Sequence, residues 1–106
     1  MLDGVRVAAL PLAVTVSSLT DELNHGDLVR RQVAARRLGW FGPAAAEAVP
    51  DLVKSLGDSG VRQEAVQSLR KIGPEARAAI PALVAIENES LIGDYVKDAL
   101  KEIRGY

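Results

Sequence analysis

Apolar residues recur along the chain at the three-and-four spacing of an amphipathic helix. In one stretch the apolar positions are Val61, Ala65, Val66, Leu69 and Ile72, and the residues between them are mostly polar. This spacing predicts a helix with one buried face over 61–72. We refer to such a helix as helix A of a repeat.

A Gly-Pro pair, Gly73-Pro74, ends this pattern. Glycine can take the left-handed conformation that terminates a helix, and proline at the first position of the next helix has a preset φ and no N–H to satisfy. A second helix, helix B, is therefore predicted to follow at once. Pro50 and Pro81 lie near the start of a helix B, where a missing backbone bond costs little, so we expect a kink or a short turn there.

The same phrase occurs twice in the chain, as GPAAAEAVPDLV from Gly42 and as GPEARAAIPALV from Gly73. Aligning Asp27 with Asp58 gives a period of 31 residues. Self-similarity at such a period indicates a solenoid, and short connections force antiparallel helix pairs. We predict an all-α protein, a right-handed α-solenoid of antiparallel helix pairs with about five to six helices.

The repeat divides residues 1–106, taken as one domain, into a partial repeat (1–26), two repeats (27–57 and 58–89) and a C-terminal partial repeat (90–106). A helix B is expected to begin at Pro11, after a short helical segment from Leu2 to Ala9. In the last unit, matching Ala99 to Ala65 and Ile103 to Leu69 predicts three extra residues in the loop before the final helix.

Small and charged residues repeat at the positions where helices should meet. Ala34 and Ala65, like Ala48 and Ala79, are suited to close helix approach. Asp58 precedes a helix A and can cap it or pair with Arg62, and Asp27 and Arg31 repeat this arrangement. Two interpretations stay open: a ladder of Asp and Arg along the seam between repeats, or ordinary capping with solvated arginines.

Two segments resemble HEAT repeats, specifically the short variety also called phycobilisome-lyase-like HEAT repeats. They are VRQEAVQSLRKIGPEARAAIPALVAI (61–86) and RRQVAARRLGWFGPAAAEAVPDLVKSL (30–56). The Val-Arg-x-x-Ala opening, the Gly-Pro turn and the Ala-Val/Ile-Pro-x-Leu phrase carry the resemblance. Arg30 departs from it by occupying the position of Val61, which leaves Val29 or Val33 to supply the apolar contact.

Composition adds few constraints on function. The net charge of −1 creates no long-range field for collecting nucleic acid, and the absence of cysteine excludes disulfides and thiolate chemistry. The apolar run Val7–Val16 is too short to span a bilayer. It resembles a weak signal peptide, but Asp3 and Pro11 argue against cleavage. We expect a soluble, cytoplasmic protein without a membrane segment.

Candidate catalytic chemistry is sparse. His25 is the only histidine and lies in a polar loop, so no acid-base pair or metal site is predicted. The His-Glu dipeptides of the di-iron hydroxylases built from HEAT repeats are absent. Glu75, Asp94, Asp98 and Glu102 are interpreted as solvated or helix-end charges. We predict no catalytic residue, no metal, no cofactor and no enzymatic activity.

The resemblance implies a non-enzymatic scaffold that binds a protein partner, with B helices lining the concave side. Taking Leu52, Leu83, Val53 and Val84 as core, the residues expected to project from that side are Asp51, Lys54, Ser55, Ala82, Ala85 and Ile86, with Leu12 and Val16 if Pro11 matches Pro50. Exposed apolar residues suggest a protein partner or self-association. Homo-oligomers through an uncapped solenoid end are also expected.

Trp40 stands where the repeat places Lys71, so it is a candidate binding anchor, with packing against the N-terminal segment as the alternative. Two further functions stay open. Lyases that act on bilin pigments share this repeat type. Arg30, Arg31, Arg36 and Arg37 cluster, which favours a nucleic-acid surface, but Gln67 and Ser68 replace Arg36 and Arg37 in the next repeat and break the stripe.

Overall fold

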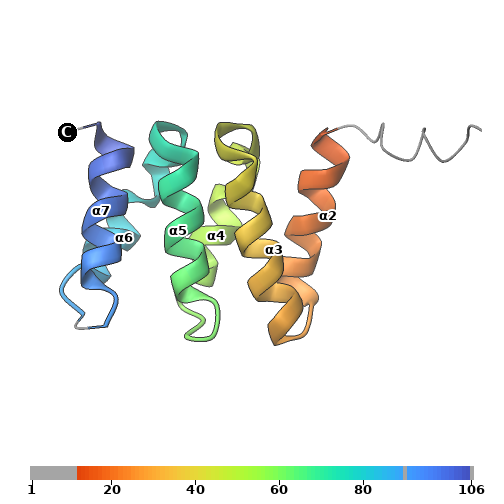
Figure 1. Cartoon of the computed structure of the whole chain (residues 1–106), viewed down its shortest axis with the longest axis horizontal. Coiled ribbons are helices and arrows are strands. Elements are labelled where there is room, and N and C mark those ends of the chain that lie inside the picture. Colours follow the sequence, from red (N-terminus) through yellow and green to blue (C-terminus); the bar gives the residue numbers. More distant parts are fainter. Residues whose placement is uncertain (1–11, 90, 106) are drawn as a thin grey trace, which may run out of the picture.

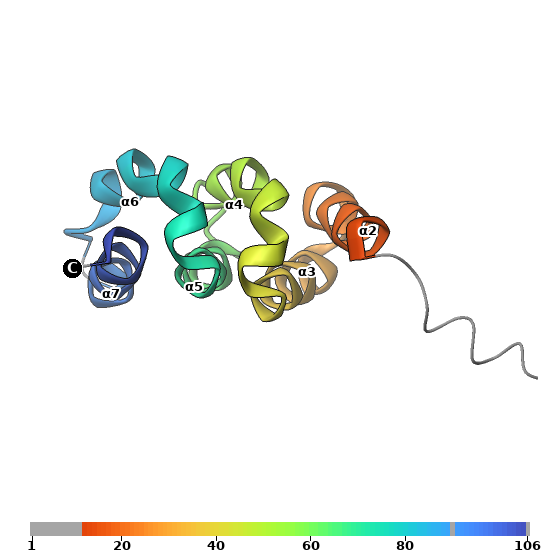
Figure 2. The same ribbon diagram turned by 90° about the horizontal axis from the view of Figure 1, so that it is seen from above.

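The computed structural model describes residues 12–89 and 91–105, and there the chain stacks α-helices in two layers. The α-helices are α2 (Leu12–His25), α3 (Leu28–Trp40), α4 (Val49–Ser55), α5 (Arg62–Ile72), α6 (Ile80–Ile86) and α7 (Gly93–Arg104) (Figure 1). We call α3, α5 and α7 the A layer, and α2, α4 and α6 the B layer (Figure 2). The predicted all-helical α-solenoid is confirmed. The predicted segment from Leu2 to Ala9, like Pro11, lies outside the described residues.

Each A helix except the last ends at a Gly-Pro pair, as predicted. The φ angles of Gly42 and Gly73 are 58° and 75°. Gly73 combines its positive φ with a ψ of −141°, a region open essentially to glycine alone. At Gly73 the turn therefore differs from the left-handed helix cap expected from the sequence, and the chain passes directly from the A layer into the B layer.

The B units begin with a short 3₁₀-helix and continue as an α-helix. The 3₁₀-helices are η1 (Gly42–Ala48) and η2 (Gly73–Ala79). Pro50 and Pro81 are the second residues of α4 and α6, where the amide has no partner within the helix anyway. The short turn before the main helix, predicted at both prolines, is confirmed.

A single core cluster runs between the two layers. Its largest fully buried side chains include Leu38, Leu52, Leu69, Ile72, Leu83 and Ile103. The small residues Ala34, Ala65, Ala48 and Ala79 are buried too, which allows the close helix contacts expected of them. From α2, Val16 and Leu23 join the core, so the prediction that Val16 projects from the surface is wrong.

The last helix keeps the period of the others, and the predicted longer loop is wrong. α4 ends at Ser55 and α5 begins at Arg62, while α6 ends at Ile86 and α7 begins at Gly93, so the two connections are equal in length. The residues that precede α5 and α7, Val61 and Ile92, share the same backbone angles (φ −124°, ψ −7°). Val96, Leu100 and Ile103 thus replace Ala65, Leu69 and Ile72, and all six are buried.

Along the described helices, none combines the length and the apolar character needed to cross a lipid bilayer.

Candidate functional site

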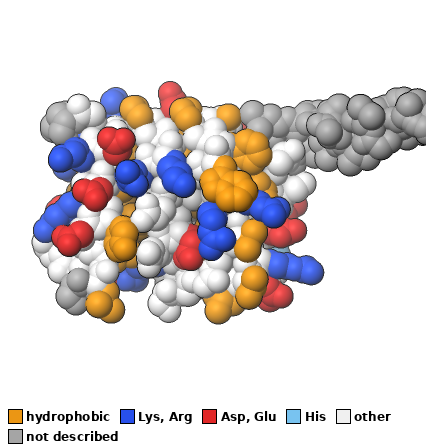
Figure 3. All heavy atoms as spheres, in the orientation of Figure 1, with side chains coloured by type: hydrophobic (Ala, Val, Ile, Leu, Met, Phe, Trp, Pro, Cys, Tyr) orange, Lys and Arg blue, Asp and Glu red, His pale blue; other side chains and the backbone are white. Residues whose placement is uncertain are grey.

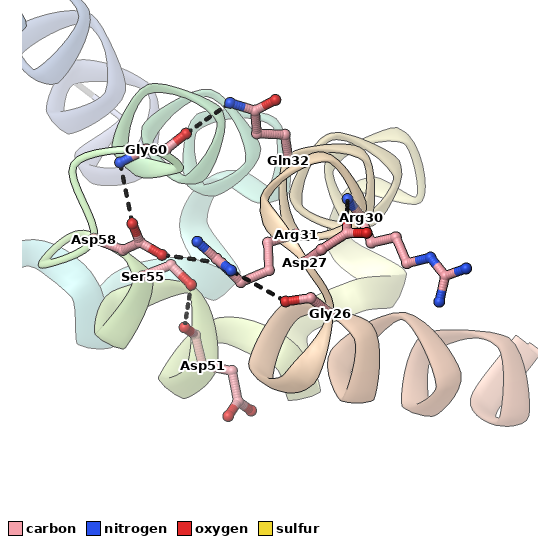
Figure 4. A network of polar contacts seen from close by, with 9 residues as sticks. All are labelled: Gly26, Asp27, Arg30, Arg31, Gln32, Asp51, Ser55, Asp58 and Gly60. Carbon is pink, nitrogen blue, oxygen red and sulfur yellow. Dashed lines mark hydrogen bonds and ion pairs between the residues drawn. The ribbon is translucent and has the colours of Figure 1, made fainter.

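Two arginines, Arg31 and Arg62, tie neighbouring repeats together near the N-terminal ends of the A helices. Figure 4 shows the contacts of Arg31. Arg31 donates from Nε to Oδ2 of Asp58 (3.1 Å) and from Nη1 to the carbonyl oxygen of Gly26 (3.1 Å). Arg62 repeats this, donating from Nη1 to Oε1 of Glu89 (2.5 Å) and from Nε to the carbonyl oxygen of Leu56 (2.6 Å). Each arginine therefore binds the loop that precedes its own helix and an acidic residue in the loop that precedes the next A helix.

The predicted ladder of Asp and Arg between repeats is present in part, because the Arg31–Asp58 pair is followed by Arg62–Glu89, and the pairing within a repeat is absent. Asp58 binds Arg31 of the preceding repeat rather than Arg62, because Arg62 is drawn toward Leu56 and Glu89. The other carboxylate oxygen of Asp58 accepts from the amide of Gly60 (3.1 Å), whereas Asp27 caps α3 by accepting from the amide of Arg30 (2.9 Å). The acidic residues thus order the loops that connect the layers.

Replacing Arg62 by methionine is expected to lower the free energy of unfolding by about 1–2 kcal/mol, since the carbonyl oxygen of Leu56 loses its donor. Glu89→Gln should cost only about 0.5 kcal/mol, because the Glu89 side chain is 48% exposed and solvent screens the pair. Urea denaturation of both single variants and the double variant gives the coupling energy. A coupling that does not weaken in high salt would contradict an ion pair of this kind.

The four arginines of α3 do not form one continuous basic surface. Arg31 is held by Asp58 and Gly26, while Arg30, Arg36 and Arg37 are exposed, and no carboxylate among the described residues pairs with them. In the next repeat the positions of Arg30 and Arg37 are taken by Val61 and Ser68, which are buried. The predicted break in the basic stripe is therefore present in the fold.

An open groove of about 340 Å³ runs between α3 and α5 on the A layer. Its lining includes Arg36, Glu64 and Lys71, whose side chains can offer hydrogen bonds and charges of both signs to a partner. His25 is exposed at the end of α2. Across the described residues, no three or more His, Cys, Asp or Glu side chains are grouped so that they could hold a metal ion.

The residues predicted for the B surface are only partly available. Lys54 and Ala85 are exposed, whereas Asp51, Ala82 and Ile86 are partly buried. The carboxylate of Asp51 accepts a hydrogen bond from the side-chain amide of Asn24 in α2 (3.0 Å).

Two of the sequence-based predictions for α4 and α6 are wrong.

 Ser55 was expected at the surface, but it is buried, and its hydroxyl donates to the carbonyl oxygen of Asp51 (3.0 Å). Val84 was expected in the core, but it is 39% exposed, because no further B helix covers α6 in the described part of the chain. Its counterpart Val53 lies in α4, which is followed by α6 in the B layer, and Val53 is partly buried against the core.

Trp40 ends α3 and is 65% exposed. It belongs to the A layer, whereas the other predicted contact residues belong to α4 and α6 in the B layer (Figure 2). The structure therefore does not unite the predicted set in one site. The adjacent Phe41 packs against the core, as its match to Ile72 predicts.

The two layers end differently at the C-terminal side. In the A layer, the exposed Lys97 of α7 takes the position of the buried residues Ala35 and Val66. In the B layer, the exposed flank of α6 is apolar, since Val84 is uncovered and Ile80 is only partly buried. Sequence reasoning missed this difference, because the predicted alignment of Ala99 with Ala65 places Lys97 opposite the polar Gln63 and not at a core position.

Comparison with known proteins gives one match. The family model described as HEAT repeats matches residues 16–102. No curated protein and no solved structure matches the chain. The matched segment covers most of the chain and includes α3, α5, most of α7 and the two helical Gly-Pro units described above. The chain belongs to the HEAT repeat family.

Proposed function

We propose that this protein is a non-enzymatic scaffold that binds a partner protein through its stacked helices. HEAT repeats commonly serve as protein-interaction scaffolds, which supports the proposal at the level of the family. The observation that carries it for this chain is α6. Its sequence, IPALVAI, has no polar side chain, yet Pro81, Val84 and Ala85 are exposed. An exposed apolar surface on a rigid helix is typical of a protein-binding site.

The residues predicted for this surface support the same proposal. Lys54 and Ala85 are exposed at equivalent positions of α4 and α6, so the B surface changes from charged to apolar along the array. Self-association through the apolar end of α6 and a cytoplasmic location stay predictions within this proposal. The nucleic-acid alternative has less support, because Arg31 is engaged by Asp58 and the basic cluster does not continue on α5.

Affinity capture from the source cells tests the proposal with a matched pair of variants. Ala85→Glu places a charge on the apolar B surface, at the position where the preceding repeat already carries Lys54. Ala44→Glu is the control, since Ala44 is also exposed and its counterpart in the next repeat is Glu75. We expect both variants to fold, and we expect only Ala85→Glu to lose the captured protein.

Two results would count against this surface. A protein that the wild type and both variants capture equally binds elsewhere. A protein that both variants fail to capture is sensitive to added negative charge in general, and not to the B surface. Capture of nucleic acid in place of protein would contradict the proposed function itself.

A further inference from the structure

The side of α3 that faces away from α5 carries an unusual set of residues, which we call the open flank. It consists of Val29, Arg30, Val33, Arg37 and Trp40. Their spacing places them along one side of the helix. At the positions equivalent to Arg30 and Arg37, Val61 and Ser68 of the second repeat and Ile92 and Ala99 of the last unit are buried, whereas the residues equivalent to Val29, Val33 and Trp40 are exposed or partly buried. The edge of the flank at Arg30 and Arg37 is thus the one that the other A helices bury in the stack, and Val29, Val33 and Trp40 border it on the outer side.

Contacts within the stack show what such a flank receives. The hydroxyl of Ser68 donates to the carbonyl oxygen of Ala35 in α3, and a Cβ on Gly39 would come within 2.9 Å of the Cα of Ser68. An A helix therefore lies directly on this side of α5. In the described part of the chain no A helix precedes α3, and Arg30 and Arg37 are exposed there. Arg30 and Arg37 therefore stand at positions that a neighbouring A helix covers elsewhere in the stack.

The open flank also has apolar side chains that are largely uncovered. Val29 and Trp40 are each 65% exposed, and Val33 between them is partly buried. Tryptophan is among the residues that most often anchor an interface, because it offers a large and rigid contact area. Hydrophobic and basic side chains gather over α3 in the space-filling view (Figure 3).

The charges on α3 are all of one sign. Its sequence, LVRRQVAARRLGW, contains no acidic residue, and Arg30, Arg36 and Arg37 are exposed without a carboxylate partner among the described residues. The apolar line from Val29 to Trp40 is therefore bordered by guanidinium groups. Complementary charges on a binding partner are carboxylates that flank an apolar stripe.

We propose that the open flank of α3 binds an acidic amphipathic helix of a partner protein. This inference rests on the proposed scaffold function and specifies one partner surface for it. α3 has 13 residues, so a helix lying along it contacts about 20 Å of its length. The apolar stripe of the partner covers Val33 and Trp40, while its carboxylates bind Arg30 and Arg37.

A nucleic acid is the competing occupant, and the arrangement of charge favours the helix. A phosphate backbone needs several basic contacts along a track. On the next repeat the track would pass Val61 and Ser68, which are buried, and Glu64, which is acidic. The apolar side chains of Val29 and Val33 add nothing to phosphate binding.

Synthetic amphipathic peptides of about 18 residues serve as the probe, one with a leucine stripe flanked by glutamate and one with glutamine in place of every glutamate. Trp40 is the only tryptophan of the chain, so its emission reports on the flank. We expect the glutamate peptide to shift the Trp40 emission to shorter wavelength and to bind at least about tenfold more tightly than the glutamine peptide at low salt.

Variants locate the binding, measured by the anisotropy of a labelled glutamate peptide. Arg30→Gln combined with Arg37→Gln should weaken binding about tenfold, and Trp40→Ala by a similar factor. The matched controls are Lys101→Gln combined with Arg104→Gln, which removes two exposed charges from α7, and Leu91→Ala, which removes an exposed apolar side chain. Both controls should bind as the wild type does.

Four results would overturn the inference. They are equal binding of the two peptides, equal weakening by the control variants, tighter binding of a single-stranded oligonucleotide, and a Trp40 that is shielded from a soluble quencher before any peptide is added. If the peptide does not bind the open flank but protein capture still depends on Ala85, only the proposed binding site on α3 is wrong. Loss of protein capture contradicts the scaffold itself.

Discussion

Replacing Leu69 by alanine is expected to lower the free energy of unfolding by about 3 kcal/mol. Leu69 is fully buried in α5, the A helix that lies between α3 and α7. Truncation loses the transfer free energy of the removed atoms and leaves a cavity that the surrounding helices fill only in part. Because domains of this size are stable by only about 5–15 kcal/mol, the change should be obvious in urea denaturation.

Leu91→Ala is the matched control for this prediction. Leu91 is 94% exposed, so the same substitution should change the free energy of unfolding by less than about 0.5 kcal/mol. Similar losses for both leucines would mean that α5 does not pack as described. A change in the slope of the urea transition, without a change in its midpoint, would indicate an altered unfolded state instead.

Local chemistry explains why much of the fold could be predicted from the sequence. The turn at Gly73 and the position of Pro81 follow from properties of single residues, namely a permitted positive φ and a missing N–H. The repeat then predicts how the helix pairs stack, because a helix pair that recurs must bury its apolar face against its copies.

The register of α7 could not be predicted, and the reason is geometric. Matching Ala99 to Ala65 shifts the helix by three residues, a rotation of about 300°, so the apolar face moves by only about 60°. Hydrophobic periodicity hardly distinguishes the two alignments. Lys97 also hides the correct one, because α7 has no A helix after it in the described chain and a charge is tolerated at that position.

The candidate surfaces were predicted less well than the fold, because exposure depends on neighbours that the repeat alignment does not reveal. Val53 and Val84 have the same place in the repeat, yet only Val84 is exposed, since it lies on the last B helix. Trp40 was recognised by its departure from the pattern. Its alignment along α3 with Val29 and Arg37, however, emerged only once the uncovered side of the helix was known.

Replacing Gly39 by valine is expected to lower the free energy of unfolding by about 3 kcal/mol, because α3 and α5 touch at this point. A Cβ on Gly39 would lie 2.7 Å from the hydroxyl oxygen and 2.9 Å from the Cα of Ser68. The backbone of α5 cannot yield as a flexible side chain would, so the two helices must separate. Separation also weakens the buried hydrogen bond from Ser68 to Ala35.

Gly57→Ala controls for the entropy that any glycine replacement removes from the unfolded chain. The nearest atom to a Cβ on Gly57 is the carbonyl oxygen of Lys54 at 3.5 Å, an ordinary contact, so this variant should be neutral or more stable by up to about 1 kcal/mol.

Urea denaturation compares the stability of Gly39→Val and Gly57→Ala with that of the wild type. If Gly39→Val unfolds at the wild-type midpoint, the helices have room to spare and the close α3–α5 contact is wrong. If Ser68→Ala partly restores Gly39→Val, the hydroxyl supplies part of the clash, and the rest comes from the backbone of α5, whose position the stack fixes.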